Sequence, residues 1–339
     1  MEAVETDFLH GQLEERKRRL ETAIAQSPQN QDLTGLLHEV DSALDRFSTG
    51  TYGLCETCHD TVERDRLLAD PLVRYCLDHL TRSERDDLQR DLDLASKLQR
   101  TLLPPVGLRV HGWDTSYHYA PVGPVSGDYC DLFTANGQLF FVLGDISGKG
   151  VAASMRMTQL HALFRSLSSL GLRLGQIVEQ VNRFLCDSAL AGQYATLVCG
   201  QANCAGELEI FNAGHTPVIV SRAGDDTRSE VARAGDVQRF ESTGMPLGMF
   251  HGVAVSGVSL KLDAGDTLFL YTDGLSEARG ADDEYGVDRV ASLVYTQSAQ
   301  SPGDLISACL ADLRVFAAAV PPFDDLTLLA IRRVDGFDA

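Results

Sequence analysis

The sequence predicts an α+β protein in which a helical, metal-binding N-terminal region precedes a larger layered domain. Two observations predict this class. Residues 1–105 carry helical apolar repeats around a cysteine-rich stretch, whereas residues 106–335 carry short apolar runs separated by Gly and Asp. Strand-like runs with grouped helices favour a layered α+β domain over a βαβ repeat. The 339 residues are enough for about two domains.

The overall charge argues against two classes of function. A formal net charge of −19 argues against a general role on nucleic acid or on a membrane surface, because both need a basic face. No apolar run approaches the roughly 18 residues that span a bilayer. The opening segment, MEAVETDFLHGQLEERKRRL, lacks the apolar core of a signal peptide. We therefore expect a cytoplasmic protein that binds neither nucleic acid nor membrane.

The first region, residues 1–50, is predicted to be a helical hairpin. Pro28 breaks the pattern in its middle and marks a loop at the hairpin tip. Apolar residues recur at near-heptad spacing on both sides of this loop. They are Phe8, Leu13, Leu20 and Ile24, then Leu33, Leu37, Leu44 and Phe47.

The second region, residues 51–80, has the spacing of a zinc site. Cys55 and Cys58 are two residues apart, and Cys76 follows after seventeen more. Zinc prefers four nitrogen or sulfur ligands in a tetrahedron, and His79 stands where a fourth is expected. His59 and Asp78 compete for that place. A thioredoxin-like redox role is disfavoured because no strand–helix context follows the cysteine pair. We expect one structural Zn²⁺.

The third region, residues 81–105, is predicted to be a linker helix that ends at Pro104 and Pro105. One apolar stripe along it is marked by Leu88, Leu92, Ala95 and Leu102, and it is widened by Leu94 and Leu98. The stripe fits either a helix packed on its own domain or a dimer coiled coil that leads into the next domain. In both cases the helix would couple the N-terminal module to the larger domain.

The fourth region, residues 106–335, alternates between strands and helices. Strands are predicted at 139–143, 195–200, 208–211, 218–220, 253–260, 267–271 and 326–331. Helices are predicted near 150–168, 173–189 and 303–317.

Four stretches in this region place Asp beside Gly, or beside a second Asp, at a strand edge: SGDYCD, GDISGKG, YTDGLSE and FDDLT. A single Asp-Gly pair is usually a turn, but four stretches of this kind in order, each next to a strand, indicate a shared site. Carboxylates that share one small volume repel one another unless cations neutralise them. Oxygen ligands favour Mg²⁺ or Mn²⁺ over zinc. The stretch GDISGKG is not a phosphate-binding P-loop, because it lacks Gly-x4-Gly-Lys-Ser/Thr.

These stretches, together with NAGHTPVIV, GMPLG and DDLTLLAI, resemble the SpoIIE/RsbU-type branch of the PPM serine/threonine phosphatases. The resemblance covers about residues 98–333, with the motifs in family order. It implies a β-sandwich of two antiparallel sheets flanked by helices. It also implies metal-dependent hydrolysis of phosphoserine or phosphothreonine by a water that two metal ions activate.

The resemblance also assigns residues. Asp145 would bridge two Mn²⁺ or Mg²⁺ ions, helped by the backbone carbonyl of Ile146. Asp128 would hold one ion, and Asp273 and Asp324 the other. Asp324 is preferred to Asp325 because the family's ligand is the first residue of its Asp-Asp/Asn-x-Thr motif.

Further expectations rest on the same resemblance. The substrate would be a phosphorylated STAS-type antagonist of an anti-sigma factor in a partner-switching pathway, and the chain would be a homodimer. His215 is expected to form a turn rather than to transfer protons. The branch lacks the phosphate-binding Arg motif of eukaryotic relatives, so substrate contacts stay unassigned.

The stretch TYGLCETCHDTVERDRLLADPLVRYC is similar to the DksA/TraR zinc finger. The last Cys of that family is replaced by His79, which implies a Cys3His site. The hairpin tip has only Asp32 in place of the paired acidic residues with which such proteins act inside RNA polymerase. A phosphatase regulated by this module is therefore expected; the alternative is an RNA polymerase-binding regulator with an accessory phosphatase domain.

Overall fold

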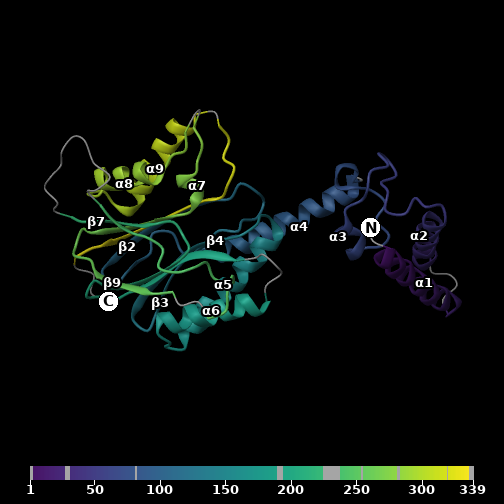
Figure 1. Cartoon of the computed structure of the whole chain (residues 1–339), viewed down its shortest axis with the longest axis horizontal. Coiled ribbons are helices and arrows are strands. Elements are labelled where there is room, and N and C mark those ends of the chain that lie inside the picture. Colours follow the sequence, from purple (N-terminus) through teal and green to yellow (C-terminus); the bar gives the residue numbers. More distant parts are fainter. Residues whose placement is uncertain are drawn as a thin grey trace. The chain divides into compact units, whose positions relative to one another are not determined.

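The computed structural model describes residues 3–26, 31–80, 82–188, 194–223, 237–252, 255–280, 283–318 and 320–335. The chain divides into two compact units, Met1–Asp91 and Leu92–Ala339. We describe each unit by itself (Figure 1). The predicted hairpin tip around Pro28 lies outside the described residues.

The N-terminal unit opens with the predicted helical hairpin, formed by α1 (Ala3–Gln26) and α2 (Gln31–Ser48). Its small core is built from Leu9 and Leu13 of α1 with Val40 and Ala43 of α2, all almost fully buried. The same core continues into the cysteine-rich stretch. That stretch holds two short helical pieces, α3 (Arg64–Ala69) and the 3-10 turn η1 (Leu77–His79).

The predicted linker helix is present as α4 (Arg82–Arg100), three residues shorter at its C-terminus than the sequence pattern indicates. Its apolar stripe is only partly covered. Leu88, Leu94 and Leu98 are 44%, 56% and 60% exposed, whereas Leu102, just beyond the helix, packs against the core of the second unit.

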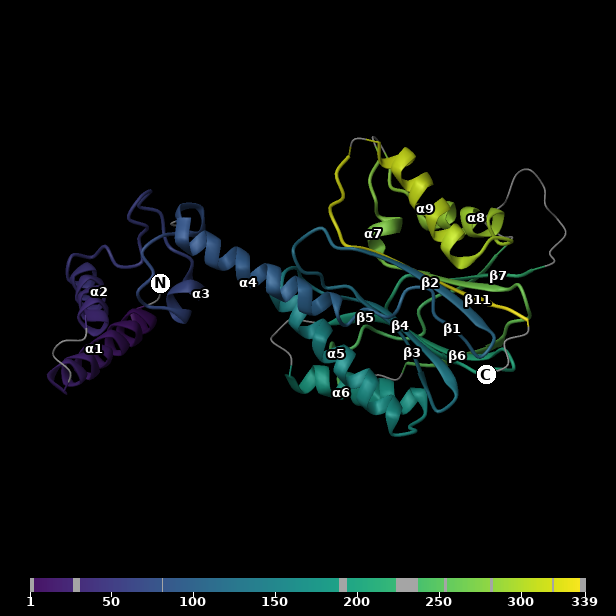
Figure 2. The ribbon, with the colours of Figure 1, turned by 180° about the vertical axis from the view of Figure 1, so that it is seen from behind.

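The second unit is built on two antiparallel sheets (Figures 1 and 2). Along the six-stranded sheet the order is β1 (Arg109–Val110), β2 (Trp113–Ala120), β11 (Leu326–Arg333), β10 (Thr267–Tyr271), β7 (Val218–Ser221) and β8 (Gln238–Phe240). Along the five-stranded sheet it is β3 (Tyr129–Ala135), β4 (Gln138–Ile146), β5 (Ala195–Ala202), β6 (Glu207–Ala213) and β9 (Gly257–Lys261).

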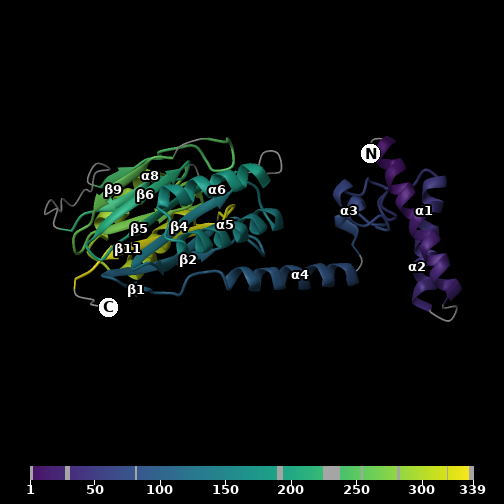
Figure 3. The ribbon, with the colours of Figure 1, turned by 90° about the horizontal axis from the view of Figure 1, so that it is seen from below.

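Helices cover the outer face of each sheet. The helices α5 (Val151–Ser169) and α6 (Leu174–Ser188) pack on the five-stranded sheet (Figure 3). On the six-stranded sheet lie α8 (Val287–Thr296) and α9 (Pro302–Ala317), next to the short α7 (Asp273–Ser276) (Figure 2). Between the sheets is a core of large buried side chains that includes Trp113, Phe141 and Leu329. The predicted β-sandwich flanked by helices is confirmed.

Some elements escaped prediction for identifiable reasons. In β3 the run is interrupted by Asp131, which is fully buried and forms an ion pair of 2.6 Å with Arg165 on α5. A buried charge with a partner on another element cannot be recognised from local sequence. The amphipathic helix α8 was not predicted either. The strand predicted at 253–260 begins at Gly257, and residues 253–254 lie outside the described part.

Candidate functional site

The strand pairings bring the four predicted carboxylates to one end of the sandwich. Tyr129 pairs with Gly144, so Asp128 and Asp145 lie at the same end of the β3–β4 hairpin. Tyr271 pairs with Leu328, so Asp273, just after β10, and Asp324, just before β11, lie at one end of that pair. Each sheet therefore contributes two acidic residues from segments far apart in the sequence.

Two threonines join the sheet ends. The hydroxyls of Thr272 and Thr327 both donate to Oδ2 of Asp128, the first over 3.1 Å. Thr272 directly precedes Asp273, and Thr327 lies three residues after Asp324. Asp128 of one sheet is thus anchored to the ends of the two strands of the other sheet that Asp273 and Asp324 flank.

Glycines allow the close backbone approach that this convergence requires. A Cβ atom on Gly127 would lie 3.1 Å from the carbonyl oxygen of Ile146 and 3.3 Å from Oδ1 of Asp145. On Gly274, a Cβ atom would overlap the carbonyl oxygen of Asp325. Gly127, which precedes Asp128, and Gly274, which follows Asp273, are therefore needed for packing at the site and not only for a turn.

The electrostatics of the site are those of clustered carboxylates whose negative charge is only partly compensated, by the Lys149 ammonium group paired with Asp324. Burial, reinforced by Asp273, Asp324 and Asp325, raises the pKa of Asp145 to about 7. The pKa of Asp128 is raised well above its ordinary value, chiefly by burial and then by the charges of Asp145 and Asp325. Burial and Asp324 also raise the pKa of Asp273. A hard divalent cation would remove this repulsion, so the donor set fits Mg²⁺ or Mn²⁺.

Asp324 and Asp325 differ in what they already contact. The Asp325 carboxylate accepts hydrogen bonds from the backbone of Val122 (2.8 Å) and Gly127 (3.2 Å) and from the Ser126 hydroxyl (2.5 Å). Asp325 therefore braces the loop that carries Asp128. Asp324 instead forms an ion pair with Lys149, with 3.0 Å between Nζ and Oδ2. The Asp325 carboxylate thus accepts more backbone hydrogen bonds than that of Asp324, and the choice of Asp324 as the metal ligand stays a prediction.

Gln99 is a site-supporting residue that sequence reasoning missed. It lies near the C-terminal end of α4 and is 6% exposed. Its amide donates to the Ser126 carbonyl over 2.7 Å and accepts from the Ser126 backbone N–H over 3.0 Å. The linker helix is thereby clamped to the loop two residues before Asp128. No local pattern marks such a contact, because the two residues are 27 positions apart.

His215 forms a turn, as expected. Its backbone N–H donates to the Asn212 side chain over 2.9 Å, and the Asn212 amide donates to the Thr216 carbonyl over 3.0 Å. The ring is buried, with Nδ1 located 2.9 Å from the Thr196 hydroxyl. Burial lowers the pKa of His215 to about 4, so the ring is neutral at neutral pH.

The second candidate site lies in the N-terminal unit. Ligand atoms of Cys55, Cys58, Cys76 and His79 all lie within 4.8 Å of one another. Sγ of Cys58 is 3.7 Å from Sγ of Cys76, which is 3.2 Å from Nδ1 of His79. Zinc–sulfur bonds of about 2.3 Å in a tetrahedron place two sulfurs about 3.8 Å apart, so the set fits zinc. His79 completes the cluster, rather than His59 or Asp78.

Among the described residues, this cysteine–histidine set is the one group of potential metal ligands whose ligand atoms all lie within 4.8 Å of one another. Among the described residues, the four carboxylates form no group of three or more ligand atoms that lie this close together. The two sites therefore differ in donor atoms and in size.

Two family models match stretches of this chain, one in each unit. The family model described as Stage II sporulation protein E (SpoIIE) matches residues 135–334. A second model, described as prokaryotic dksA/traR C4-type zinc finger, matches residues 50–85. That finger type has four cysteines, whereas the cluster described above has His79 in the fourth place.

Two individual relatives are similar to this chain over most of its length. Protein IcfG of Synechocystis sp. is 26% identical over 279 residues, which cover 74% of this chain and 42% of IcfG. Phosphoserine phosphatase RsbU of Bacillus subtilis is 23% identical over 256 residues, covering 74% of this chain and 72% of RsbU. This chain therefore spans less than half the length of IcfG.

Among solved structures, the RsbU and RsbW domains of a Mycobacterium tuberculosis protein are 28% identical, with a TM-score of 0.56. That match covers 70% of this chain and 63% of the other. In the described part of this chain, no helix has the length and apolar character needed to cross a membrane.

Proposed function

We propose that this chain, which belongs to the SpoIIE family of PPM-type serine/threonine phosphatases, hydrolyses phosphoserine or phosphothreonine on a partner protein with the carboxylate site of its second unit. One observation carries the proposal. Asp128, Asp145, Asp273 and Asp324 reach one end of the sandwich from four separate segments, and Asp145 has a pKa of about 7 there.

The carboxylates would hold two Mn²⁺ or Mg²⁺ ions. When bound, such a pair supplies a nucleophilic water at neutral pH and neutralises charge on the phosphoryl oxygens. Asp145 and the carbonyl of Ile146 would serve both ions, Asp128 one of them, and Asp273 with Asp324 the other.

The remaining residues keep these ligands in place. Thr272 and Thr327 fix the Asp128 carboxylate by hydrogen bonds, and Asp325 fixes the loop that precedes it. Lys149 is 66% exposed and bonded to Asp324, so its ammonium group stands at the edge of the site, where a phosphoryl group would arrive. Because positioned charges favour a transition state more than a mobile solvent does, such fixed geometry lowers the barrier.

For the substrate we propose a phosphorylated STAS-type protein of a partner-switching pathway in the cytoplasm. The family membership and the similarity to Phosphoserine phosphatase RsbU support a phosphoserine protein as the substrate class. The Cys3His site would hold a structural Zn²⁺ and take no part in hydrolysis.

The test is release of phosphate from a phosphorylated STAS-domain protein with and without Mn²⁺. We expect manganese-dependent release by the natural chain and none by the double variant Asp145→Asn/Asp273→Asn. The matched control is Asp187→Asn, which changes an exposed carboxylate of the same unit. Full activity in the double variant would refute the proposed site.

We further propose that the chain is a homodimer and that α4 transmits the state of the N-terminal module to the catalytic unit. The exposed Leu88, Leu94 and Leu98 support a helix seam, and the Gln99 clamp supports coupling. A Leu94→Lys/Leu98→Lys variant should sediment as a monomer. If removing residues 1–80 changes neither dimerisation nor turnover, the idea of coupling is wrong.

A further inference from the structure

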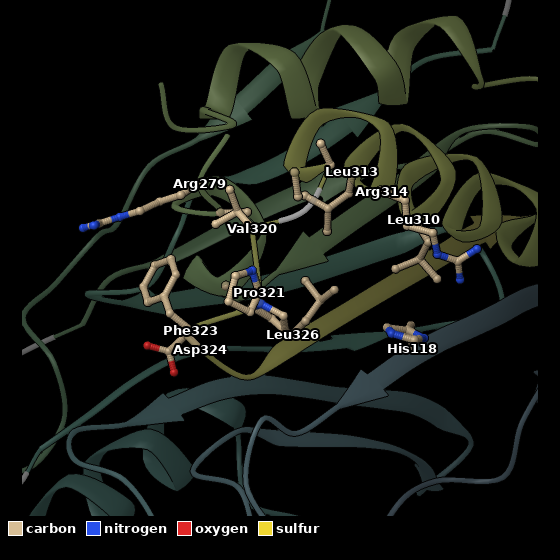
Figure 4. A pocket seen from close by; sticks show the side chains of 15 residues that line it. His118, Arg279, Leu310, Leu313, Arg314, Val320, Pro321, Phe323, Asp324 and Leu326 are labelled. Atoms are coloured by element: carbon tan, nitrogen blue, oxygen red, sulfur yellow. The ribbon is translucent and has the colours of Figure 1, made fainter. Parts of the chain in front are cut away.

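A pocket of about 310 Å³ lies beside the carboxylate site on the α9 side of the six-stranded sheet (Figure 4). Its walls come from the C-terminal half of α9, the segment that leads into β11, and strand β2. Most of the lining is apolar: Leu310, Leu313, Val320, Pro321, Pro322 and Leu326. The volume is at the lower end of the range for small-molecule sites, which suits one or two side chains.

The pocket is continuous with the proposed catalytic site. Gly274, next to Asp273, lines it, and so do Phe323 and Asp324. Figure 4 shows Phe323 and Asp324 together at one end, with His118 and Arg314 at the other. A polypeptide whose phosphoserine lies over the carboxylates would therefore pass the pocket with a neighbouring part of its own chain.

The charge at the pocket differs from that of the chain as a whole. The chain carries a net −19, yet Arg279 and Arg314 line this pocket and are exposed. Within the described residues neither arginine forms an ion pair. The Arg279 guanidinium lies 5.3 Å from the centre of the Phe323 ring, which orients it. His118 adds no charge at neutral pH, because burial and Arg314 lower its pKa.

We propose that this pocket is a docking site for the phosphorylated substrate protein, which inserts an apolar side chain there and places an acidic residue near Arg279 or Arg314. The inference rests on the proposed function. An apolar anchor in a pocket with a charged rim is a typical arrangement of strong contacts in protein recognition. Charge complementarity to these two arginines selects an acidic segment over a neutral one.

The test uses synthetic phosphoserine peptides. In the parent peptide, phosphoserine is flanked only by Gly and Ser. In the others, a Leu-Glu pair replaces two residues at successive positions on either side of the phosphoserine. We expect the natural chain to prefer one Leu-Glu position over the parent peptide by about tenfold or more in kcat/KM. A Val320→Trp variant fills the pocket. Its kcat/KM for the preferred Leu-Glu peptide, divided by that for p-nitrophenyl phosphate, should fall to about the value for the parent peptide.

The matched control is Val315→Trp, which makes the same substitution in α9 at a position outside the pocket. Val315 is 78% exposed on α9 and does not line the pocket. This control should keep the preference. Peptides with Leu alone and with Leu-Glu at the preferred position separate the two contributions. An Arg279→Glu/Arg314→Glu double variant should retain the preference for Leu but lose the added effect of Glu.

The outcomes separate the two proposals. If the natural chain hydrolyses phosphoserine peptides with Mn²⁺ but shows no positional preference, or if Val320→Trp keeps that preference, the docking site is wrong and the proposed function stands. If no phosphoserine peptide is hydrolysed, both fall. A change of oligomeric state in Val320→Trp alone, seen by sedimentation, would instead assign the pocket to contact with a second copy of the chain.

Discussion

The two candidate metal sites are assembled in opposite ways. The four zinc ligands fall between Cys55 and His79, and their ligand atoms lie within 4.8 Å of one another. The four carboxylates are spread from Asp128 to Asp324 and meet only because two sheets end at the same place. The zinc site needs local spacing, whereas the carboxylate site needs the whole sandwich. We infer that the first holds shape and the second performs chemistry.

The largest effect is expected for Asp145→Asn. Because Asp145 would contact both ions, its loss should reduce manganese-dependent phosphate release by about 10²–10³-fold or more, the scale of removing one group that stabilises a transition state. Phosphate release at saturating Mn²⁺ measures it, with Asp187→Asn as the control. Activity within a few-fold of the natural chain would show that the carboxylate site is not the reaction centre.

Next in size is removal of a zinc ligand. Structural zinc sites contribute about 10–16 kcal/mol of binding free energy to folding. Cys55→Ser should therefore abolish zinc binding and unprotect the amides of residues 51–80 in hydrogen exchange. Manganese-dependent hydrolysis of p-nitrophenyl phosphate should remain, because the zinc site takes no part in hydrolysis, and its rate should change only as far as α4 couples the two units.

A matched control for that change is Cys204→Ser, since Cys204 is an exposed cysteine outside the cluster. Its zinc content should equal that of the natural chain. Zinc bound normally by Cys55→Ser would remove Cys55 from the ligand set. Complete loss of manganese-dependent hydrolysis together with zinc would contradict the assignment of chemistry to the carboxylate site.

Gln99→Ala should have a smaller effect. The change leaves the buried N–H and C=O of Ser126 without the Gln99 partner. Each buried polar group left unsatisfied destabilises the folded state by about 1–3 kcal/mol. The loop that carries Asp128 would loosen, so the Mn²⁺ concentration for half-maximal activity should rise roughly tenfold, with a smaller change in the rate at saturating metal. Lys97→Ala, which changes an exposed neighbour in the same helix, should leave that concentration unchanged. Equal manganese dependence in both variants would show that the clamp does not support the site.

The smallest effect concerns pH. The pKa of Asp145 in the folded, metal-free chain is about 7, above its unfolded value of about 3.9, so the folded state binds this proton more tightly. Folding stability from this group is therefore full at acid pH and decreases as pH rises between about 4 and 7. The melting temperature of metal-free protein should fall by a few degrees from pH 5 to pH 8.

Manganese should restore that melting temperature at pH 8, because a bound cation takes the place of the proton. Asp145→Asn should flatten the pH dependence. A melting temperature that rises over the same interval in metal-free protein would contradict the proposed repulsion among the carboxylates.

The same contrast explains what could be predicted from the sequence. The candidate zinc ligands and the motif carboxylates could be proposed from the sequence because each is marked by neighbours in the chain, such as Cys-x-x-Cys or Asp-Gly. The strand β3 and the clamp residue Gln99 could not, because Asp131 and Gln99 are satisfied by partners 34 and 27 positions away. The fourth zinc ligand needed three-dimensional distances to separate His79 from His59 and Asp78. In each case the missing information was a contact between distant segments or a distance in space.

The most direct test of the central claim is phosphate release from a phosphoserine substrate by the natural chain, with its bound zinc quantified and Mn²⁺ then added in steps. We predict no release with one zinc per chain alone, and saturable release as Mn²⁺ is added. Full release by the zinc-loaded chain without Mn²⁺ or Mg²⁺, even after chelation of loosely bound metal, would contradict the assignment of chemistry to the carboxylate site.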